Sequence, residues 1–371
     1  MIAILTDFTG YDNAYALNQC VRNNIKMLTR NGYHPLLLVR KGANTRQYHT
    51  RTVAIDGGRG GTNRIEIDDQ SEDEINLIHN QLKEALKDIS FVFTHDLLMQ
   101  PNLWKYHVAA RRLAKERQDI RWLHSVHSLA DMGQSQAHIE LRGKFPNSRL
   151  WVYSQFEAMA CRYGYHPSEL VRLPAPIDFL EYMHPIAQDI ARPIMDADII
   201  ITYPCRLDRG KRPEKVLDIA AELVNRGYNT KVILVNSYTN QGDKKQYREE
   251  LRQHSKVDLI LTSDIAGCEV RTPHQVVMDL FQLSDIIIQP SITESYSRVV
   301  CEAAWNGCLL VLNDRVPVFN NYNAIFLSDK NLIDKIILQI ENNPVLTSHR
   351  LMRQERSLEA IWPQLKNVIH P

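Results

Sequence analysis

Short apolar runs alternate with amphipathic segments along the whole chain, and this alternation limits the fold more than any other feature. Runs such as "MIAILTD", "FVFTHD" and "RLWVYS" have the length and composition of buried strands. Residues 13–31 show helical periodicity, and Gly32 ends that pattern. Strands that alternate with helices predict βαβ units and a mainly parallel sheet.

A break in the pattern divides the chain. Residues 183–197 contain two prolines and little periodicity, so we expect a linker there. It separates a first domain, 1–182, from a second, 198–347, and the length of 371 residues suits two domains. The basic amphipathic segment 348–371 is expected to be a helix that packs back on the first domain. We therefore expect the α/β class, with two doubly wound, Rossmann-like domains facing each other across a ligand-binding cleft.

Composition excludes some partners and locations. Apolar residues make up 44% of the chain and charged residues 23%, as in a globular protein with a large core. The formal net charge of +1 creates no general attraction for nucleic acid or membranes. The chain has no apolar run long enough to span a membrane and does not begin with a secretory leader. Its six cysteines include no C-x-x-C pair, so we expect reduced thiols and a cytoplasmic location.

Histidines lie at or near the ends of two predicted strands. Thr94–Asp96, "THD", could indicate a metal phosphohydrolase, but that fold is helical and this triplet ends a strand, so we expect no metal site. His124 is expected in the core or behind a site, whereas His127 follows its strand and is a candidate site residue.

A first loop with ligand-binding character follows the predicted strand "DIIITYP". Arg206 and Lys211 lie in "RLDRGK", just before a predicted helix. Two cations beside a helix N-terminus suit a diphosphate, because both charge and free amides favour anions there. The alternative is a solvated basic loop.

A second loop lies in "QPSITESYSRVVCEAAWNGCLLVLND". Glu294 is expected in the loop after a strand, and Glu302 in the second turn of the following helix, which Gly307 ends. Two acceptors at different depths suit a ligand with hydroxyls at both ends, and the amides of 295–297 suit an anion. The alternative is two exposed surface acids.

Together the two loops resemble the donor half of GT-B glycosyltransferases of the retaining family 4 type. That family has an R-L-x-x-x-K element and an E-x7-E element, and residues 198–314 match both at the expected separation. The resemblance implies a hexosyltransferase that moves a sugar, retaining its stereochemistry, from a nucleotide-sugar donor such as a UDP-hexose to a hydroxyl acceptor. It implies no metal and no cofactor, a donor-binding second domain and an acceptor-binding first domain.

The resemblance also implies roles for residues. Arg206 and Lys211 would hold the diphosphate, Glu294 the sugar hydroxyls and Glu302 the ribose, while His127 would lie over the sugar. The remaining donor-binding residues would be Ser295, Tyr296, Ser297 and Gly10.

The sequence departs from the family in places. Ser295-Tyr296-Ser297 replaces the usual glycine-rich stretch after the first glutamate, and Gly10 stands alone where a Gly-Gly loop is common. "CLLVLNDRVP" is more similar to glycosyltransferases of tailed phages. A sugar-nucleotide epimerase and an inactive nucleotide-sugar-binding protein therefore stay open as alternatives.

The acceptor is not determined by the sequence. A growing glycan or glycolipid is expected, and a hydroxymethylated base of phage DNA is the alternative. The candidate acceptor-binding residues are Arg59 and Arg64 in a glycine-rich loop and Arg111 and Arg112 on a basic helix. Peripheral membrane contact is compatible with these basic segments.

Overall fold

The computed structural model describes residues 1–6, 16–57, 68–98, 101–127, 141, 143–153, 164–237, 243–292, 297–315 and 324–370. In these residues the chain is an α/β protein with two parallel Rossmann-like sheets, of seven and six strands. It divides into unit 1, Met1–Ile177 with Ile361–Pro371, and unit 2, Asp178–Ala360. The two parallel sheets confirm the predicted fold class.

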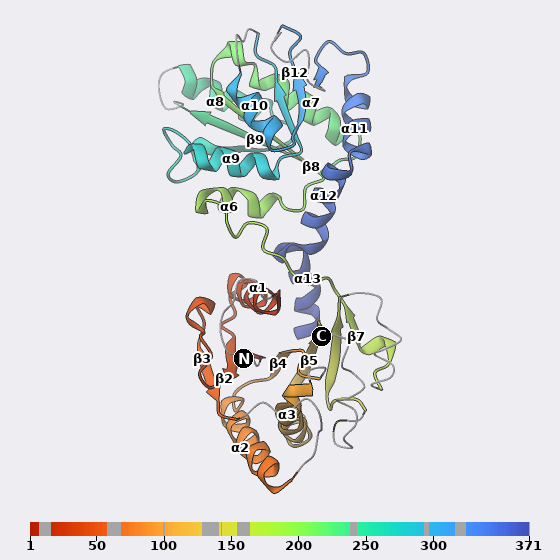
Figure 1. Cartoon of the computed structure of the whole chain (residues 1–371). Coiled ribbons are helices and arrows are strands. Elements are labelled where there is room, and N and C mark those ends of the chain that lie inside the picture. Colours follow the sequence, from red (N-terminus) through yellow and green to blue (C-terminus); the bar gives the residue numbers. More distant parts are fainter. Residues whose placement is uncertain are drawn as a thin grey trace. The chain divides into compact units, whose positions relative to one another are not determined.

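Unit 1 is built on the seven-stranded sheet, in the order β3-β2-β1-β4-β5-β6-β7, with every neighbouring pair parallel (Figure 1). Because β1 has β2 on one side and β4 on the other, the direction in which successive strands are added to the sheet reverses at β1. The strands are β1 (Ile2–Leu5), β2 (Leu36–Arg40), β3 (Thr52–Ile55), β4 (Phe91–His95), β5 (Arg121–Val126), β6 (Ser148–Val152) and β7 (Leu170–Arg172), and the helices are α1 (Ala16–Arg30), α2 (Asp69–Ala85) and α3 (Trp104–Glu116).

The helix α2 shows how local sequence forms unit 1. Asp68 caps its N-terminus by accepting a hydrogen bond from the Ser71 amide at 2.8 Å. Ile75, Ile78 and Leu82 recur at three and four residues, so they share one face and are buried against the sheet.

Unit 2 is built on the six-stranded sheet, in the order β10-β9-β8-β11-β12-β13, again entirely parallel. The winding reverses at β8, between β9 and β11. The strands are β8 (Ile199–Arg206), β9 (Thr230–Ser237), β10 (Asp258–Leu261), β11 (Ile286–Gln289), β12 (Leu309–Leu312) and β13 (Ala324–Phe326), and the helices are α6 (Pro185–Ala191), α7 (Pro213–Asn225), α8 (Asp243–His254), α9 (His274–Leu283), α10 (Arg298–Trp305), α11 (Leu332–Asn342) and α12 (Pro344–Arg356).

The strand β8 is buried on both faces. Ile199, Ile201 and Tyr203 pack into one core cluster, whereas Ile200 packs into the other with Ile287. Successive side chains of a strand point to opposite faces, so a continuous apolar run is what a strand covered by helices on both sides requires.

The segment 183–197, for which we expected a linker, contains secondary structure. Residues Pro185–Ala191 form α6, and Arg192–Ile194 form a short 3-10 turn. Pro185 lies at the first helical position, where its missing amide costs no hydrogen bond. Ala187, Ile190 and Ile194 are buried in the core of unit 2. The prolines therefore begin ordered elements of unit 2 here.

The segment 348–371, expected to be one helix, lies in two. The helix α12 ends before Ser357, whose backbone is extended, and α13 (Leu358–Ile369) follows. Residues Ile361–Pro371 belong to unit 1, where Figure 1 shows the end of α13 beside α1. The Tyr33 ring lies 5.4 Å from that of Trp362, and its hydroxyl lies 2.8 Å from Nε2 of His370.

A buried ion pair attaches α12 to the sheet of unit 2. Arg353 contacts Asp285 at 2.9 Å, and their side chains are 5% and 3% exposed. The Asp285 carboxylate also accepts a hydrogen bond from the Ile200 amide, so it joins β8, β11 and α12. Burial raises the pKa of Asp285 although Arg353 acts in the opposite direction.

Replacement of Arg353 by leucine is expected to lower the free energy of unfolding by about 3–5 kcal/mol, because it leaves Asp285 buried without its cation. Arg226→Leu is the matched control, since Arg226 pairs with Asp334 where both side chains are about half exposed; it should cost below about 1 kcal/mol. Urea denaturation of both variants measures the difference. Equal losses would show that the Arg353 pair does not hold α12.

His124 is a buried histidine in the core of unit 1, as expected. Its Nδ1 lies 2.7 Å from the Thr94 hydroxyl, and its ring packs edge-on against Phe145. Burial, with a smaller effect of Arg111, lowers its pKa to about 3. The unfolded chain therefore takes up a proton near pH 6.5 that the folded protein does not bind until near pH 3.

We expect the free energy of unfolding to fall as the pH drops below about 6.5, with His124 contributing about 2 kcal/mol of loss at pH 5 relative to pH 7. His124→Phe should remove that part of the pH dependence. Urea denaturation of wild type and variant at the two pH values measures it. The same pH dependence in both proteins would contradict a neutral, buried His124.

Candidate functional site

A cavity of about 340 Å³ lies in unit 2 where the winding of its sheet reverses. It is lined by the carboxyl-terminal part of β8, the end of β11 and the start of α10, together with residues from the loop before α9. In open parallel sheets the loops after two such neighbouring strands diverge, and ligands bind in the resulting crevice. The cavity therefore lies where a doubly wound domain binds its ligand.

Arg206 and Lys211 both line this cavity. Arg206 is the last residue of β8, and Lys211 ends the 3-10 turn Arg209–Lys211. The Tyr203 hydroxyl donates to the Lys211 carbonyl at 2.9 Å, which fixes the loop to the strand before it. The structure thus brings together the two cations that the sequence analysis paired.

The backbone after Lys211 is strained. Arg212 has φ 52° and ψ 47°, the left-handed conformation, and Pro213 follows at the first position of α7. A side chain other than glycine costs about 1 kcal/mol or more in this region. Strain of this kind persists where surrounding contacts hold a loop in one shape, as the Tyr203 hydrogen bond does here.

The lining of the cavity is cationic. Besides Arg206 and Lys211, Arg271 and Arg298 line it, and no carboxylate does among the described residues. Two acids contact these cations: Asp208 lies 3.4 Å from Nε of Arg206, whose side chain is 64% exposed, and Glu302 lies 2.6 Å from Nε of Arg298. The exposed Asp208 contact is weak, whereas Glu302 offsets the charge of Arg298, so the positive character of the cavity comes from Arg206, Lys211 and Arg271. The geometry suits an anionic ligand.

Ser297 and Glu302 position the helix α10 beside the cavity. The Ser297 side chain accepts from the Val300 amide and caps the helix, so its hydroxyl has a structural task. Glu302 is held by two bases: Nε of Arg298 at 2.6 Å and Nε2 of His274 at 2.9 Å. The Glu302 side chain is 15% exposed, so this carboxylate has a fixed direction.

Several predicted site residues lie outside the described residues. These are Gly10, Arg59, Arg64, Glu294, Ser295 and Tyr296.

A second polar site lies in unit 1, at the carboxyl ends of β4, β5 and β6. The His127 amide donates to the Asp96 carboxylate at 2.7 Å, and Asp96 has a left-handed backbone with φ 54°. The His127 ring stacks on that of His95, with centroids 5.2 Å apart and planes at 21°. Burial lowers the pKa of both imidazoles; the neighbouring His127 lowers that of His95 further, whereas the Asp96 carboxylate acts to raise that of His127.

Sequence reasoning missed His95. It treated "THD" only as a metal motif, and no group of three or more metal-binding side chains gathers in the described part of the chain. The available signal was that His95 and His127 follow the same edge of adjacent parallel strands, since β4 pairs with β5. That adjacency places the two rings together.

On α3, the predicted acceptor-binding residues Arg111 and Arg112 both have partners inside unit 1. Arg111 is buried, and its guanidinium donates to the carbonyls of Lys144 and Gly143 at 3.0 Å each. Arg112 forms a two-point ion pair with Glu72, at 2.5 and 3.1 Å. Consecutive basic residues on a helix point in different directions, and here both charges are used inside unit 1.

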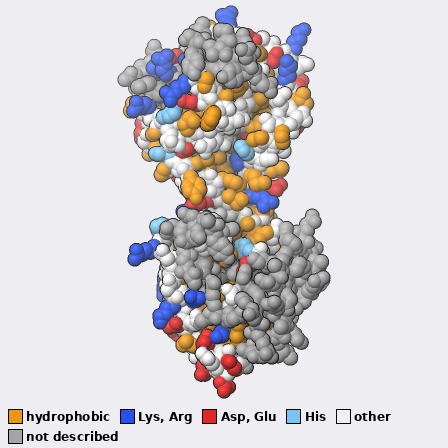
Figure 2. All heavy atoms as spheres, viewed as in Figure 1, with side chains coloured by type: hydrophobic (Ala, Val, Ile, Leu, Met, Phe, Trp, Pro, Cys, Tyr) orange, Lys and Arg blue, Asp and Glu red, His pale blue; other side chains and the backbone are white. Residues whose placement is uncertain are grey.

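Figure 2 shows acidic side chains gathered at the end of unit 1 where Figure 1 places α2.

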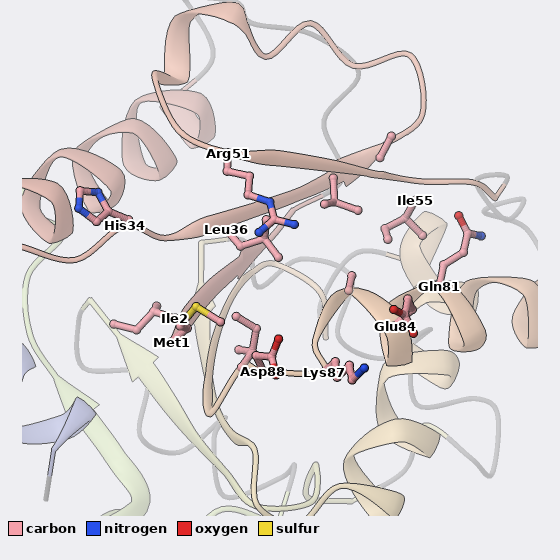
Figure 3. A pocket seen from close by; sticks show the side chains of 14 residues that line it. Met1, Ile2, His34, Leu36, Arg51, Ile55, Gln81, Glu84, Lys87 and Asp88 are labelled. Carbon is pink, nitrogen blue, oxygen red and sulfur yellow. The ribbon is translucent and has the colours of Figure 1, made fainter.

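Another cavity, of about 550 Å³, lies in unit 1 (Figure 3). It is lined by the amino-terminal residues of β1 and β2, by β3 and by the end of α2. Arg51 and Lys87 face Glu84 and Asp88 around it, so its charges are mixed. This arrangement favours no particular ligand.

Among the helices in the described part of the chain, none has the length and apolar character of a membrane span.

Comparison with known proteins finds partial similarity to a glycosyltransferase. The chain is 24% identical over 227 residues to D-inositol 3-phosphate glycosyltransferase of Rhodococcus erythropolis, covering 54% of this chain and 49% of that protein. The chain thus spans about half the length of the curated relative it matches. No family model matches the chain.

Solved structures that cover essentially all of the chain have low similarity to it, as two examples show. Sucrose-phosphate synthase from Thermosynechococcus elongatus has 16% identity and a TM-score of 0.39, covering 100% of this chain and 98% of that one. Anabaena HepE in complex with UDP has 14% identity and a TM-score of 0.40, covering 100% and 99%. By its sequence motifs and its two parallel Rossmann-like sheets, the chain is similar to GT-B glycosyltransferases of the retaining family 4 type.

Proposed function

We propose that the protein is a glycosyltransferase that moves a hexose from a uridine diphosphate sugar to a hydroxyl acceptor. The observation that carries the proposal is the cavity of unit 2, which lies at the reversal of the sheet and is lined by four cations and, among described residues, no acid. A nucleotide diphosphate is the anionic group that binds at this position in doubly wound domains.

The proposed chemistry uses Arg206 and Lys211 on the leaving group. Cleavage of the bond between sugar and diphosphate leaves additional negative charge on the terminal phosphate. Cations already held in place stabilise that charge more in the transition state than in the ground state. In this proposal the two side chains supply the positive charge, so we assign no metal to the reaction.

Recognition of the nucleoside is assigned to Glu302. A carboxylate accepts two hydroxyl protons, which suits the adjacent hydroxyls of ribose. Arg298 and His274 hold the carboxylate in advance, so less side-chain entropy is lost on binding. Glu294, Ser295, Tyr296 and Gly10 keep the donor-binding roles that the motif implies, and Ser297 contributes as the cap of α10.

Unit 1 is proposed to bind the acceptor and to supply His127. With Arg111 buried and Arg112 paired, neither offers a free cation to an anionic polymer. A glycan or glycolipid acceptor is therefore favoured over a hydroxymethylated base in DNA. Arg59 and Arg64 stay candidate acceptor contacts.

The test compares two arginines of one loop. Arg206→Ala should lower donor turnover by about 100-fold or more and abolish stabilisation by uridine diphosphate, because a cation on the leaving group is lost. Arg209→Ala is the matched control, since Arg209 contacts Glu250 at 2.7 Å and lies over the Tyr247 ring, outside the cavity lining. It should stay within about threefold of wild type.

Release of uridine diphosphate from a panel of UDP-sugars, with glycan and hydroxymethylated DNA acceptors, measures turnover. Full activity of Arg206→Ala would contradict the site. Interconversion of the free UDP-sugars without transfer would indicate the epimerase. Tight nucleotide binding without any release would indicate the binding protein.

A further inference from the structure

The two stacked histidines of unit 1 form a hydrogen-bonded pair. Nδ1 of His95 lies 2.9 Å from Nε2 of His127. His95 is 1% exposed, whereas His127 is only partly buried. Two neutral imidazole nitrogens at this distance share one proton, so one ring must donate and the other accept.

The direction of that hydrogen bond follows from Asn24 on α1. Nδ2 of Asn24 lies 3.3 Å from Nε2 of His95, the other nitrogen of the inner ring. In the orientation that the structure gives the Asn24 amide, its nitrogen only donates, so Nε2 of His95 accepts and the proton of this ring is on Nδ1; the flipped amide would present Oδ1 and require the opposite tautomer. His95 then donates to His127, which accepts at Nε2. A neutral His127 consequently carries its own proton on Nδ1.

The other groups around the pair are compatible with a neutral His127 ring whose Nε2 faces the interior of unit 1. The Ser125 hydroxyl lies 3.1 Å and the Tyr153 hydroxyl 3.5 Å from Nε2 of His127, and the two hydroxyls contact each other. Burial raises the pKa of Tyr153, and that of the nearby Cys20 thiol to about 11, so both are neutral at pH 7. Asp96 is the charged neighbour, and it accepts the His127 amide.

Every ring-nitrogen contact recorded for His127 in the described part of unit 1 involves Nε2. We propose that His95 is a positioning residue, which turns Nε2 of His127 inward and fixes His127 in the tautomer that presents Nδ1–H as a hydrogen-bond donor to the substrate. The contact between His127 and a substrate rests on the proposed function, whereas the tautomer of His127 does not depend on it.

For sugar transfer, the consequence is that His127 always offers the substrate an N–H group and never a lone pair. An imidazole whose Nδ1 carries the proton donates to an oxygen of the sugar or of the acceptor, and the other tautomer offers a lone pair at the same place. Removal of the His95 side chain should let the His127 ring exchange between its two tautomers. Because a hydrogen bond of this kind contributes about a factor of ten, we expect about a tenfold loss of turnover.

Nitrogen-15 NMR of the full chain labelled in its histidines tests the tautomer without any substrate. His127→Gln identifies the His127 signals among the fourteen histidines. In wild type at pH 7.5 we expect protonated Nδ1 and unprotonated Nε2. A protonated Nε2, or averaged signals from both tautomers, would overturn the proposal. This result requires no variant of His95, only a folded His127→Gln for the assignment.

Two variants then test the role of His95. His95→Phe keeps a stacked ring but no donor, and should give averaged tautomers and about tenfold lower turnover. His95→Asn places an amide donor near the former Nδ1 and should restore both readouts. His124→Phe is the control for loss of a buried imidazole, and should leave the His127 signals unchanged. Unchanged His127 signals in a folded His95→Phe would also overturn the proposal.

The two proposals can fail separately. The expected tautomer with no turnover of any UDP-sugar would contradict the proposed function and support the positioning by His95. Normal turnover with the other tautomer would support the proposed function and contradict the positioning.

Discussion

Parallel pairing on both sides of β8 is the constraint on which the site in unit 2 depends. Because β9 and β11 flank β8 in the same direction, the loops that follow β8 and β11 leave one sheet edge together and then diverge. This geometry brings Arg206, Lys211 and the start of α10 around one cavity although they lie far apart in sequence. The Arg353–Asp285 pair supports it from the opposite end of the same strands.

The two units use the same edge of their sheets for different chemistry. Unit 2 presents several cations there, which suits an anion whose charge increases during reaction. Unit 1 presents buried neutral imidazoles and hydroxyls with one carboxylate, Asp96, among them. Neutral groups of fixed direction suit hydroxyl recognition, because they exchange hydrogen bonds without the cost of removing a charge from water.

Local pattern was enough to predict the sheets and the meeting of Arg206 with Lys211, because strand ends follow from apolar runs and parallel order follows from alternation. It failed where long-range packing decides. Nothing near Arg111 indicates that carbonyls some thirty residues away will bury its guanidinium. The prolines of 183–197 mark helix starts as well as linkers, and only packing against α9 and β8 distinguishes the two. His95 needed the pairing of β4 with β5 before its neighbour could be named.

The central claim is that the cationic cavity of unit 2 binds a nucleotide diphosphate. A crystal structure of the protein soaked with uridine diphosphate tests it most directly. We expect the diphosphate between Arg206 and Lys211 and the ribose against Glu302. Nucleotide bound only at the mixed-charge cavity of unit 1, or an empty unit 2 at saturating concentration, would contradict it.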